Sequence, residues 1–243
     1  MNRQTAQEMR ALIVEFLGPF ALVFAGAGAI IQTGGQNLVA IALAHGLAIA
    51  LFVAAAGHVS GGVYNPAIAV GLVVARKLAP IRAAGFIVAE LLGGTVAALF
   101  LKAIYPADQI AKVALGAPAI GAGVSVGAAF FLEIILTFFL QFVIYGTAVD
   151  ERGPRAIASL AIGLTITMDI LLGGGISGAV MNPARQFGPA LIAGAWTNWW
   201  IWWLGPIIGA ALAAGLYAYV LEVRGEIPLP DTLDPDLPRD RRA

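Results

Sequence analysis

The sequence predicts an all-α membrane protein with six transmembrane helices, two re-entrant half-helices and an inverted 3+3 repeat. Three observations predict this fold: an apolar composition, six long apolar runs, and one motif that occurs twice in register. Of the 243 residues, 60% are hydrophobic and 12% are charged, whereas a soluble domain carries about 25% charged residues. The composition therefore excludes a typical soluble domain, and its apolar excess excludes a disordered chain.

Six apolar runs are long enough to cross a bilayer, because a helix needs about 20 residues to span a hydrocarbon core of about 30 Å. In chain order they are 11–31, 38–56, 81–104, 124–149, 156–172 and 199–223. We expect each run to form one membrane-spanning helix.

Two further apolar runs, 66–75 and 183–193, are too short to cross the bilayer. Each follows an Asn-Pro pair, Asn65-Pro66 in the first run and Asn182-Pro183 in the second. Asn is a preferred helix N-cap and Pro a preferred first helical residue. Both runs are therefore predicted to be half-helices that begin inside the membrane.

An internal repeat relates the two halves of the chain. The spacing from Glu15 to Asn65 is nearly the same as that from Glu133 to Asn182. Each half holds three spans, an odd number, so the second half must be inverted relative to the first. We predict a cytoplasmic N-terminus at 1–10, a first repeat at 11–118, a second repeat at 119–223, and a disordered cytoplasmic tail at 224–243.

Basic residues predict the orientation. Arg76, Lys77 and Arg82 lie between the second and third spans, and Arg152 and Arg155 between the fourth and fifth. Loops rich in Arg and Lys stay in the cytoplasm, which places both termini there. We expect a multi-pass integral membrane protein, and the short loops favour a plasma (inner) membrane.

Two motifs resemble those of a known family. Segment 58–67, HVSGGVYNPA, and segment 175–190, GISGAVMNPARQFGPA, resemble the two signature loops of the aquaporin, or major intrinsic protein, family. The resemblance covers about 11–223. It implies a six-helix channel, a homotetramer with one pore per subunit, and a lipid bilayer with water and small neutral solutes as the partners. With zero net charge, no Cys and two His, we expect no nucleic-acid partner, no metal and no cofactor.

The paired motifs predict how such a channel excludes protons. Each half-helix N-terminus carries roughly half a positive charge, and two that meet at mid-membrane repel cations. The amides of both Asn can also hold the oxygen of a passing water, although they can alternatively serve only as caps. The extended segments before them are expected to form a ladder of backbone carbonyls. The motif residues are Asn65, Pro66, Ala67, Asn182, Pro183 and Ala184, and the ladder residues are Gly61, Gly62, Val63, Tyr64, Gly178, Ala179, Val180 and Met181.

Ionisable residues within spans need partners, because a charge in the membrane costs at least a few kcal/mol. We expect Glu15, Glu133 and His58 to support the two loops. A proton-coupling role is the alternative for the two glutamates. Glu90 and Asp169 are expected to be structural, with Asp169 bonded either to the pore residues or to a helix backbone.

The resemblance also implies a selectivity filter formed by His45, Ile170, Ala179 and Arg185. This set is similar to the filters of plant tonoplast intrinsic proteins and of the aquaporin-8 branch, whose members conduct water and ammonia, and some urea or hydrogen peroxide. We hypothesise that a neutral His45 facing Arg185 accepts a proton from ammonium. The alternative is that His45 only bonds to a neighbouring helix.

The function expected from these features is passive conduction of water and small neutral solutes, with exclusion of protons and ions. Ammonia, urea, glycerol and hydrogen peroxide are the candidate solutes. An ion-coupled secondary transporter is the alternative, because inverted repeats and broken helices occur there too. We do not expect an enzyme, since the sequence shows no nucleophile–base pair or phosphate-binding loop.

We predict that mercurials do not inhibit this protein. They commonly block the family through a cysteine near the filter, whereas this chain has no Cys and carries Ala179 at the corresponding position. Osmotic swelling of proteoliposomes should proceed at the same rate with and without mercuric chloride. Rapid inhibition that a thiol reverses would contradict the assignment of Ala179.

Overall fold

The computed structural model describes residues 2–222, and this part of the chain is helical without strands. Six of its helical segments are long and apolar enough to cross a membrane, which confirms the predicted all-α fold. They are α1 (Arg3–Thr33), α2 (Leu38–Ser60), α4 (Pro80–Ile104), α6 (Val126–Ile144) continued by η2 (Tyr145–Val149), α7 (Ala158–Gly173) preceded by η3 (Arg155–Ile157), and α9 (Ile201–Leu216) continued by η4 (Tyr217–Leu221).

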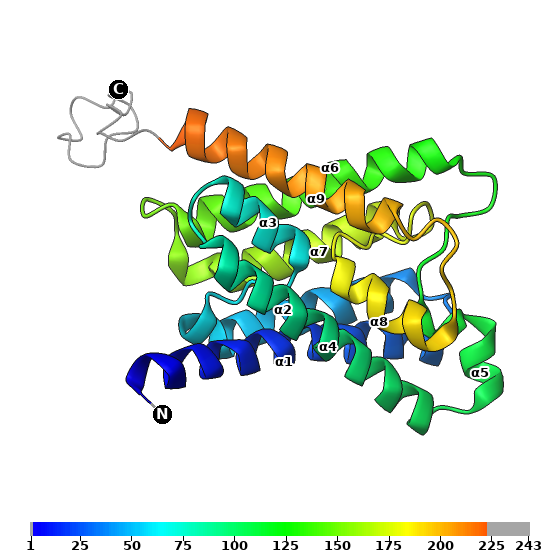
Figure 1. Ribbon diagram of the computed structural model, residues 1–243. Helices are drawn as coiled ribbons and strands as arrows, with labels where there is room; N and C mark the ends of the chain where they lie inside the picture. Colours follow the sequence, from blue (N-terminus) through cyan, green and yellow to red (C-terminus); the bar gives the residue numbers. More distant parts are fainter. Residues whose placement is uncertain (1, 223–243) are drawn as a thin grey trace, which may run out of the picture.

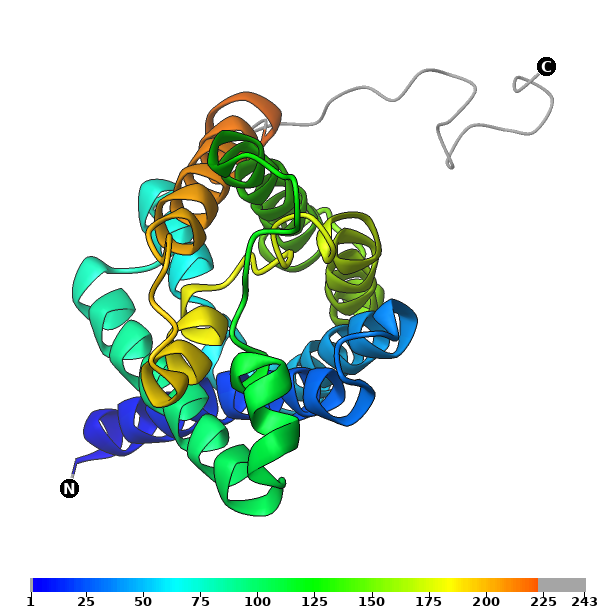
Figure 2. The ribbon, with the colours of Figure 1, turned by 90° about the vertical axis from the view of Figure 1, so that its right-hand side faces the viewer.

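Two short helices, α3 (Pro66–Val74) and α8 (Pro183–Ala193), start next to each other and run toward opposite ends of the bundle (Figure 1). Seen along the bundle, the long helices surround the segment that leads into α8, drawn in yellow (Figure 2). The first N–H groups of a helix have no partner within the helix. A half-helix that begins at mid-membrane must therefore have its N-terminus inside the protein. The bundle provides that interior.

The helix of the first span extends beyond the predicted apolar run toward the N-terminus. Helix α1 begins at Arg3, because Asn2 caps it by accepting a hydrogen bond from Thr5 N at 2.8 Å. Residues 3–10, predicted as the cytoplasmic N-terminus, are therefore helical and form the first turns of α1. A short helix, α5 (Ala107–Lys112), and a turn of 3-10 helix, η1 (Ala114–Gly116), were not predicted. The predicted tail at 224–243 lies outside the described residues.

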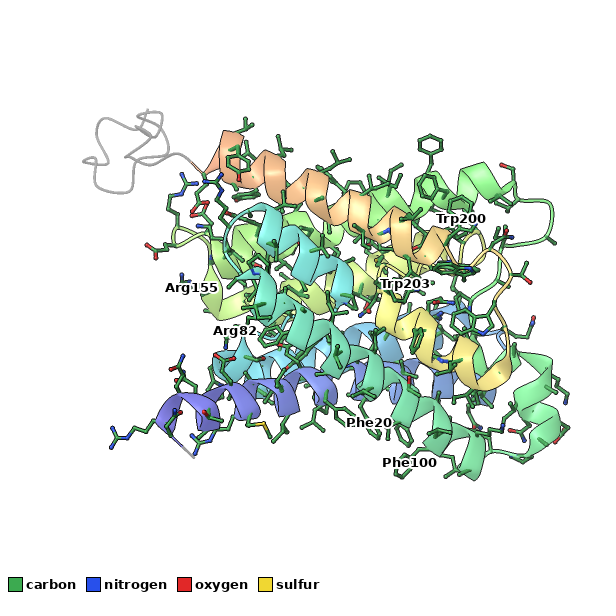
Figure 3. All side chains as sticks on the ribbon, in the orientation of Figure 1. Phe20, Arg82, Phe100, Arg155, Trp200 and Trp203 are labelled. Atoms are coloured by element: carbon green, nitrogen blue, oxygen red, sulfur yellow. The ribbon has the colours of Figure 1, made fainter. Side chains whose placement is uncertain are left out.

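The side chains at the two ends of the bundle differ in character (Figure 3). Arg82 and Arg155 lie at the end where α1 begins and α9 finishes, whereas Trp200 and Trp203 lie toward the opposite end. Tryptophan collects at membrane–water interfaces and Arg at the cytoplasmic side. This distribution agrees with the predicted orientation.

Glycines let the helices approach closely at corresponding points of the two halves. In the first half, a Cβ at Gly93 of α4 would overlap the carbonyl oxygen of Phe16 in α1. In the second half, a Cβ at Gly209 of α9 would overlap the carbonyl oxygen of Ile134 in α6. Close contact between backbones is a common basis of helix association in membranes.

We predict that Gly209→Ala destabilises the bundle by about 1–3 kcal/mol, the usual cost of overpacking. The added methyl would meet a backbone oxygen, which cannot rotate away as a side chain could. Gly215→Ala in the same helix is the matched control, since nothing lies within 4 Å of its Cβ position. Thermal unfolding in detergent should show a lower midpoint for the first variant only, and equal midpoints would contradict the predicted contact.

Candidate functional site

The starts of α3 and α8 are joined by reciprocal hydrogen bonds. Asn65 Nδ2 donates to the carbonyl of Met181 at 2.8 Å, and Asn182 Nδ2 donates to the carbonyl of Tyr64 at 2.8 Å. Each bond links one half of the chain to the other. The two loops therefore form one unit in the middle of the protein.

Each Asn side chain also caps its own helix. Asn65 Oδ1 accepts from Ala67 N at 2.9 Å, and Asn182 Oδ1 accepts from Ala184 N at 2.9 Å. An Asn amide has two N–H donors, so each side chain keeps one N–H that neither bond uses. Both Asn residues line the same central cavity. Each Asn therefore caps its helix and still has one free donor N–H in a residue that lines the cavity.

Glu15 of α1 holds the first loop. Its Oε1 accepts from Val63 N at 3.0 Å and its Oε2 from Tyr64 N at 2.7 Å. Tyr64 has a left-handed φ of 51°, a conformation uncommon for a residue other than Gly. Two charge-assisted hydrogen bonds offset the strain of this backbone.

Glu133 of α6 holds the second loop in the same way. Its Oε1 accepts from Val180 N at 2.9 Å and its Oε2 from Met181 N at 2.8 Å. Ala179 and Met181 are left-handed, with φ of 45° and 54°. The two glutamates thus occupy equivalent positions and make equivalent contacts in the two halves.

In a trans peptide the N–H and C=O groups point in opposite directions. Because the loop N–H groups point toward the glutamates, the carbonyls of the same peptides point away from them. The carbonyls of Tyr64 and Met181 accept from the opposite Asn, as described above. Those of the other residues of the predicted ladder accept no hydrogen bond from residues 2–222: Gly61, Gly62, Val63, Gly178, Ala179 and Val180. All eight residues except Gly61 line the central cavity or the outer one described below.

Two serines that the sequence analysis missed shape the loops. Ser60 Oγ accepts from Gly62 N at 3.1 Å, and Ser177 Oγ accepts from Ala179 N at 3.2 Å. Ser177 also donates to Glu133 Oε1 at 2.7 Å. A signal was available, because Ser-Gly stands at the same distance before the Asn in both motifs.

His58 does not have the supporting contact expected of it. It is exposed near the C-terminal end of α2, where it faces the first turns of α1 and makes no hydrogen bond within residues 2–222. The residue that contacts the loop from this end of α2 is Ser60, two positions later. His58 and Ser60 point in different directions because helix residues two apart do not share a face.

Glu90 of α4 extends the support of the first loop. Its Oε1 accepts from Asn65 N at 2.9 Å, and its carboxyl group lies next to that of Glu15. Two adjacent carboxylates in an apolar interior cannot both carry a charge without strong repulsion. One shared proton removes the repulsion and gives Glu90 Oε2, otherwise without a partner in the described chain, a hydrogen bond to Glu15.

Asp169 of α7 is fully buried, and neither carboxylate oxygen has a hydrogen-bond partner within residues 2–222. Within the described part of the chain it forms no ion pair or hydrogen bond with His45 or Arg185, and none with a helix backbone. Neither predicted contact of Asp169 is present in the structure, and we have no physical account of this residue.

The central cavity adjoins an outer one, and the two share lining residues. His45, Ile170 and Arg185 line both cavities, whereas Ala179 lines only the central one. The outer cavity is bordered by Pro118 and by other residues of the loop before α6. The four residues expected at the filter therefore come together from three helices and a loop, and three of them stand at the junction.

The hydrogen bonds of His45 define its tautomer. Its Nδ1 lies 2.8 Å from the carbonyl oxygen of Ile41, and its Nε2 lies 3.4 Å from Arg185 Nε. A carbonyl can only accept and a guanidinium can only donate. Nδ1 therefore carries the proton, and the lone pair of Nε2 accepts from Arg185.

This geometry opposes the hypothesis that His45 takes a proton from ammonium. The only lone pair of the ring is engaged by Arg185, and a protonated ring would have to break that bond. The fixed cation repels ammonium as well. Arg185 itself is 5% exposed, and its Nη1 has no partner within residues 2–222, so this donor is available at the junction.

We predict that Glu90→Gln keeps water permeability close to that of the wild type, whereas Glu90→Leu lowers it. Gln has the same length, accepts from Asn65 N and can donate to Glu15, whereas Leu leaves a buried N–H unpaired at a cost of about 1–3 kcal/mol. Stopped-flow swelling per reconstituted channel measures the effect. Equal permeability of the Leu and Gln variants would contradict the role given to the Glu90 carboxyl.

Comparison with known proteins assigns this architecture to a family. Residues 2–217 match the family described as major intrinsic protein. The chain is 42% identical to aquaporin TIP4-4 of Zea mays over 235 residues, which is 91% of this chain and 91% of that protein. It is 40% identical to aquaporin TIP1-2 of Zea mays over 219 residues, covering 86% of this chain and 84% of the relative.

A solved structure is similar as well. The X-ray structure of the aquaglyceroporin from Plasmodium falciparum superposes with a TM-score of 0.80 at 26% identity, covering 88% of this chain and 97% of that chain. The chain is thus an integral, multi-pass membrane protein. It belongs to the major intrinsic protein, or aquaporin, family of passive channels for water and small solutes.

Proposed function

We propose that the conducting path passes through both cavities, with His45, Ile170, Ala179 and Arg185 as its selectivity filter. The observation that carries this proposal is that His45, Ile170 and Arg185 line the central and the outer cavity alike. A molecule that moves from one cavity to the other must pass these side chains.

We propose that Asn65 and Asn182 exclude protons at the centre of the path. Their free N–H donors, next to the positive ends of α3 and α8, would bind the oxygen of a passing water. Such a water cannot accept from its neighbours, so a continuous proton wire is interrupted. Free loop carbonyls on both sides would hold the water hydrogens.

We propose that the filter passes water and ammonia as neutral molecules. Ile170 and Ala179 offer no donor and no bulky ring, so one side of the filter is apolar and comparatively open. Ammonia would cross as NH₃ that has lost its proton before the filter, since the lone pair of His45 is engaged by Arg185. Urea, glycerol and hydrogen peroxide are further candidates, and the structural neighbour named above is an aquaglyceroporin.

An ion-coupled transporter is not favoured. Such a protein needs carboxylates that bind and release a coupling ion. Glu15 and Glu133 instead hold four backbone N–H groups of the loops. Releasing them to bind an ion would undo the loops that line the path.

We propose that both termini face the cytoplasm, that 11–118 and 119–223 form the two inverted repeats, and that four copies assemble into a homotetramer, as the family resemblance implies. The position of Arg82 and Arg155 supports the orientation (Figure 3). The plasma membrane predicted from the sequence gains no support from the relatives, which are TIP-type, that is tonoplast, aquaporins.

The proposed function is tested by osmotic swelling of proteoliposomes that contain the purified protein. We expect fast swelling with a low activation energy and the same rate with or without an ion gradient. Parallel assays with ammonia, urea, glycerol and hydrogen peroxide establish the solute range. A rate that depends on an ion gradient would instead indicate a coupled transporter.

We predict that Arg185→Val raises urea permeability relative to water and allows a measurable cation or proton leak. The substitution removes the fixed charge and the donor at the junction and widens the filter. Arg155→Val is the control, since Arg155 is exposed at the end of the bundle. If Arg185→Val and Arg155→Val have the same selectivity, Arg185 is not part of the filter.

A further inference from the structure

The ring of His45 occupies space that only a glycine at position 26 leaves open. A Cβ at Gly26 of α1 would lie 2.5 Å from His45 Cε1, and it would overlap Nε2 and Cδ2. Real Cβ atoms do not approach other atoms so closely, so any other residue at this position would force the ring to move. The Nε2 side of the ring therefore rests directly against the backbone of α1.

Gly26 lies at the level where the central and outer cavities meet. Leu22, one turn before it, lines the central cavity, and Ile30, one turn after it, lines the outer cavity. Residues four apart share one face of a helix. The face of α1 that carries Gly26 therefore borders the path, and Gly26 lies behind His45 where the two cavities meet.

The ring cannot avoid a larger residue by a simple rotation. Its Nδ1 is bonded to the carbonyl of Ile41 at 2.8 Å, and its Nε2 faces Arg185 Nε at 3.4 Å. With α1 on one side and both nitrogens engaged, the remaining direction is away from α1. Ile170 and Arg185 line the same two cavities as His45, so a ring displaced from α1 moves into the space that these residues border.

We propose that Gly26 is a positioning residue that sets the width of the filter by letting the imidazole of His45 recede against α1. The proposal deepens the function proposed above and rests on it. In this view the openness of the filter has two sources, the small or apolar side chains of Ala179 and Ile170 and the missing side chain at position 26. Width is thereby determined by a residue that does not itself contact a solute.

The test compares Gly26→Ala with the wild type in proteoliposomes, with water, hydrogen peroxide and urea permeabilities measured on the same preparation. We expect the permeability to the largest solute that the wild type conducts to fall about tenfold more than that to water, which is within the discrimination that one methylene gives in an apolar pocket. If the wild type conducts water alone, water permeability itself should fall.

Gly28→Ala is the matched control on the same helix. Its Cβ would lie 3.4 Å from Leu101 Cδ2, an ordinary contact, so selectivity should stay as in the wild type. The decisive variant is His45→Ala combined with Gly26→Ala. Without the ring there is nothing to displace, so the double variant should have the same permeabilities as His45→Ala alone.

The double variant also keeps the proposal testable if Gly26→Ala by itself fails to fold. If Gly26→Ala is not recovered but the double variant is recovered at wild-type yield, the clash with the ring is confirmed. Three results would overturn the proposal: permeabilities of Gly26→Ala equal to those of the wild type, equal losses for all solutes of a wild type that conducts more than water, or the same loss with and without the ring. A wild type that conducts no water would overturn the proposed function instead, whatever Gly26 does.

Discussion

The structure depends on the satisfaction of backbone N–H groups in two segments that cross the apolar interior without being helical. Unpaired N–H groups at this depth cost several kcal/mol each. Glu15 accepts hydrogen bonds from two N–H groups of the first loop, and Glu133 accepts from two N–H groups of the second loop. Because the N–H groups are turned toward the carboxylates, the carbonyls are turned the other way. One interaction thus supports the loops and orients the acceptors that line the path.

The reciprocal bonds of Asn65 and Asn182 extend this constraint from each loop to the whole bundle. Each amide caps its own helix and donates to the carbonyl before the other Asn. The helix starts therefore cannot shift independently, and the two free donors keep a constant separation. A fixed pair of donors between two positive helix ends is what a channel needs to bind water in one orientation and repel cations.

At the proposed filter, polar side chains satisfy one another's hydrogen bonds. Nε2 of His45 accepts a hydrogen bond from Arg185, and the Nδ1–H group donates to the backbone of α2. These bonds hold the ring and the guanidinium at the junction while leaving Arg185 Nη1 unpaired within the described chain. The backbone of α1 at Gly26 completes the position of the ring. The charge and the free donor of Arg185 and the space beside the His45 ring therefore depend on the same set of contacts at the junction of the cavities.

The sequence by itself determined the six spans, the two half-helices and the residues Asn65, Asn182, Glu15 and Glu133, because membrane length, capping and internal repetition are local or periodic signals. It did not determine that His45 bonds to Arg185, that Glu90 pairs with Glu15, that Ser60 rather than His58 contacts the loop, or that Gly26 makes room for a ring. Only the tertiary structure decided these points. Each depends on the direction of a side chain and on contact between segments far apart in the chain, which neither hydrophobic periodicity nor motif spacing encodes.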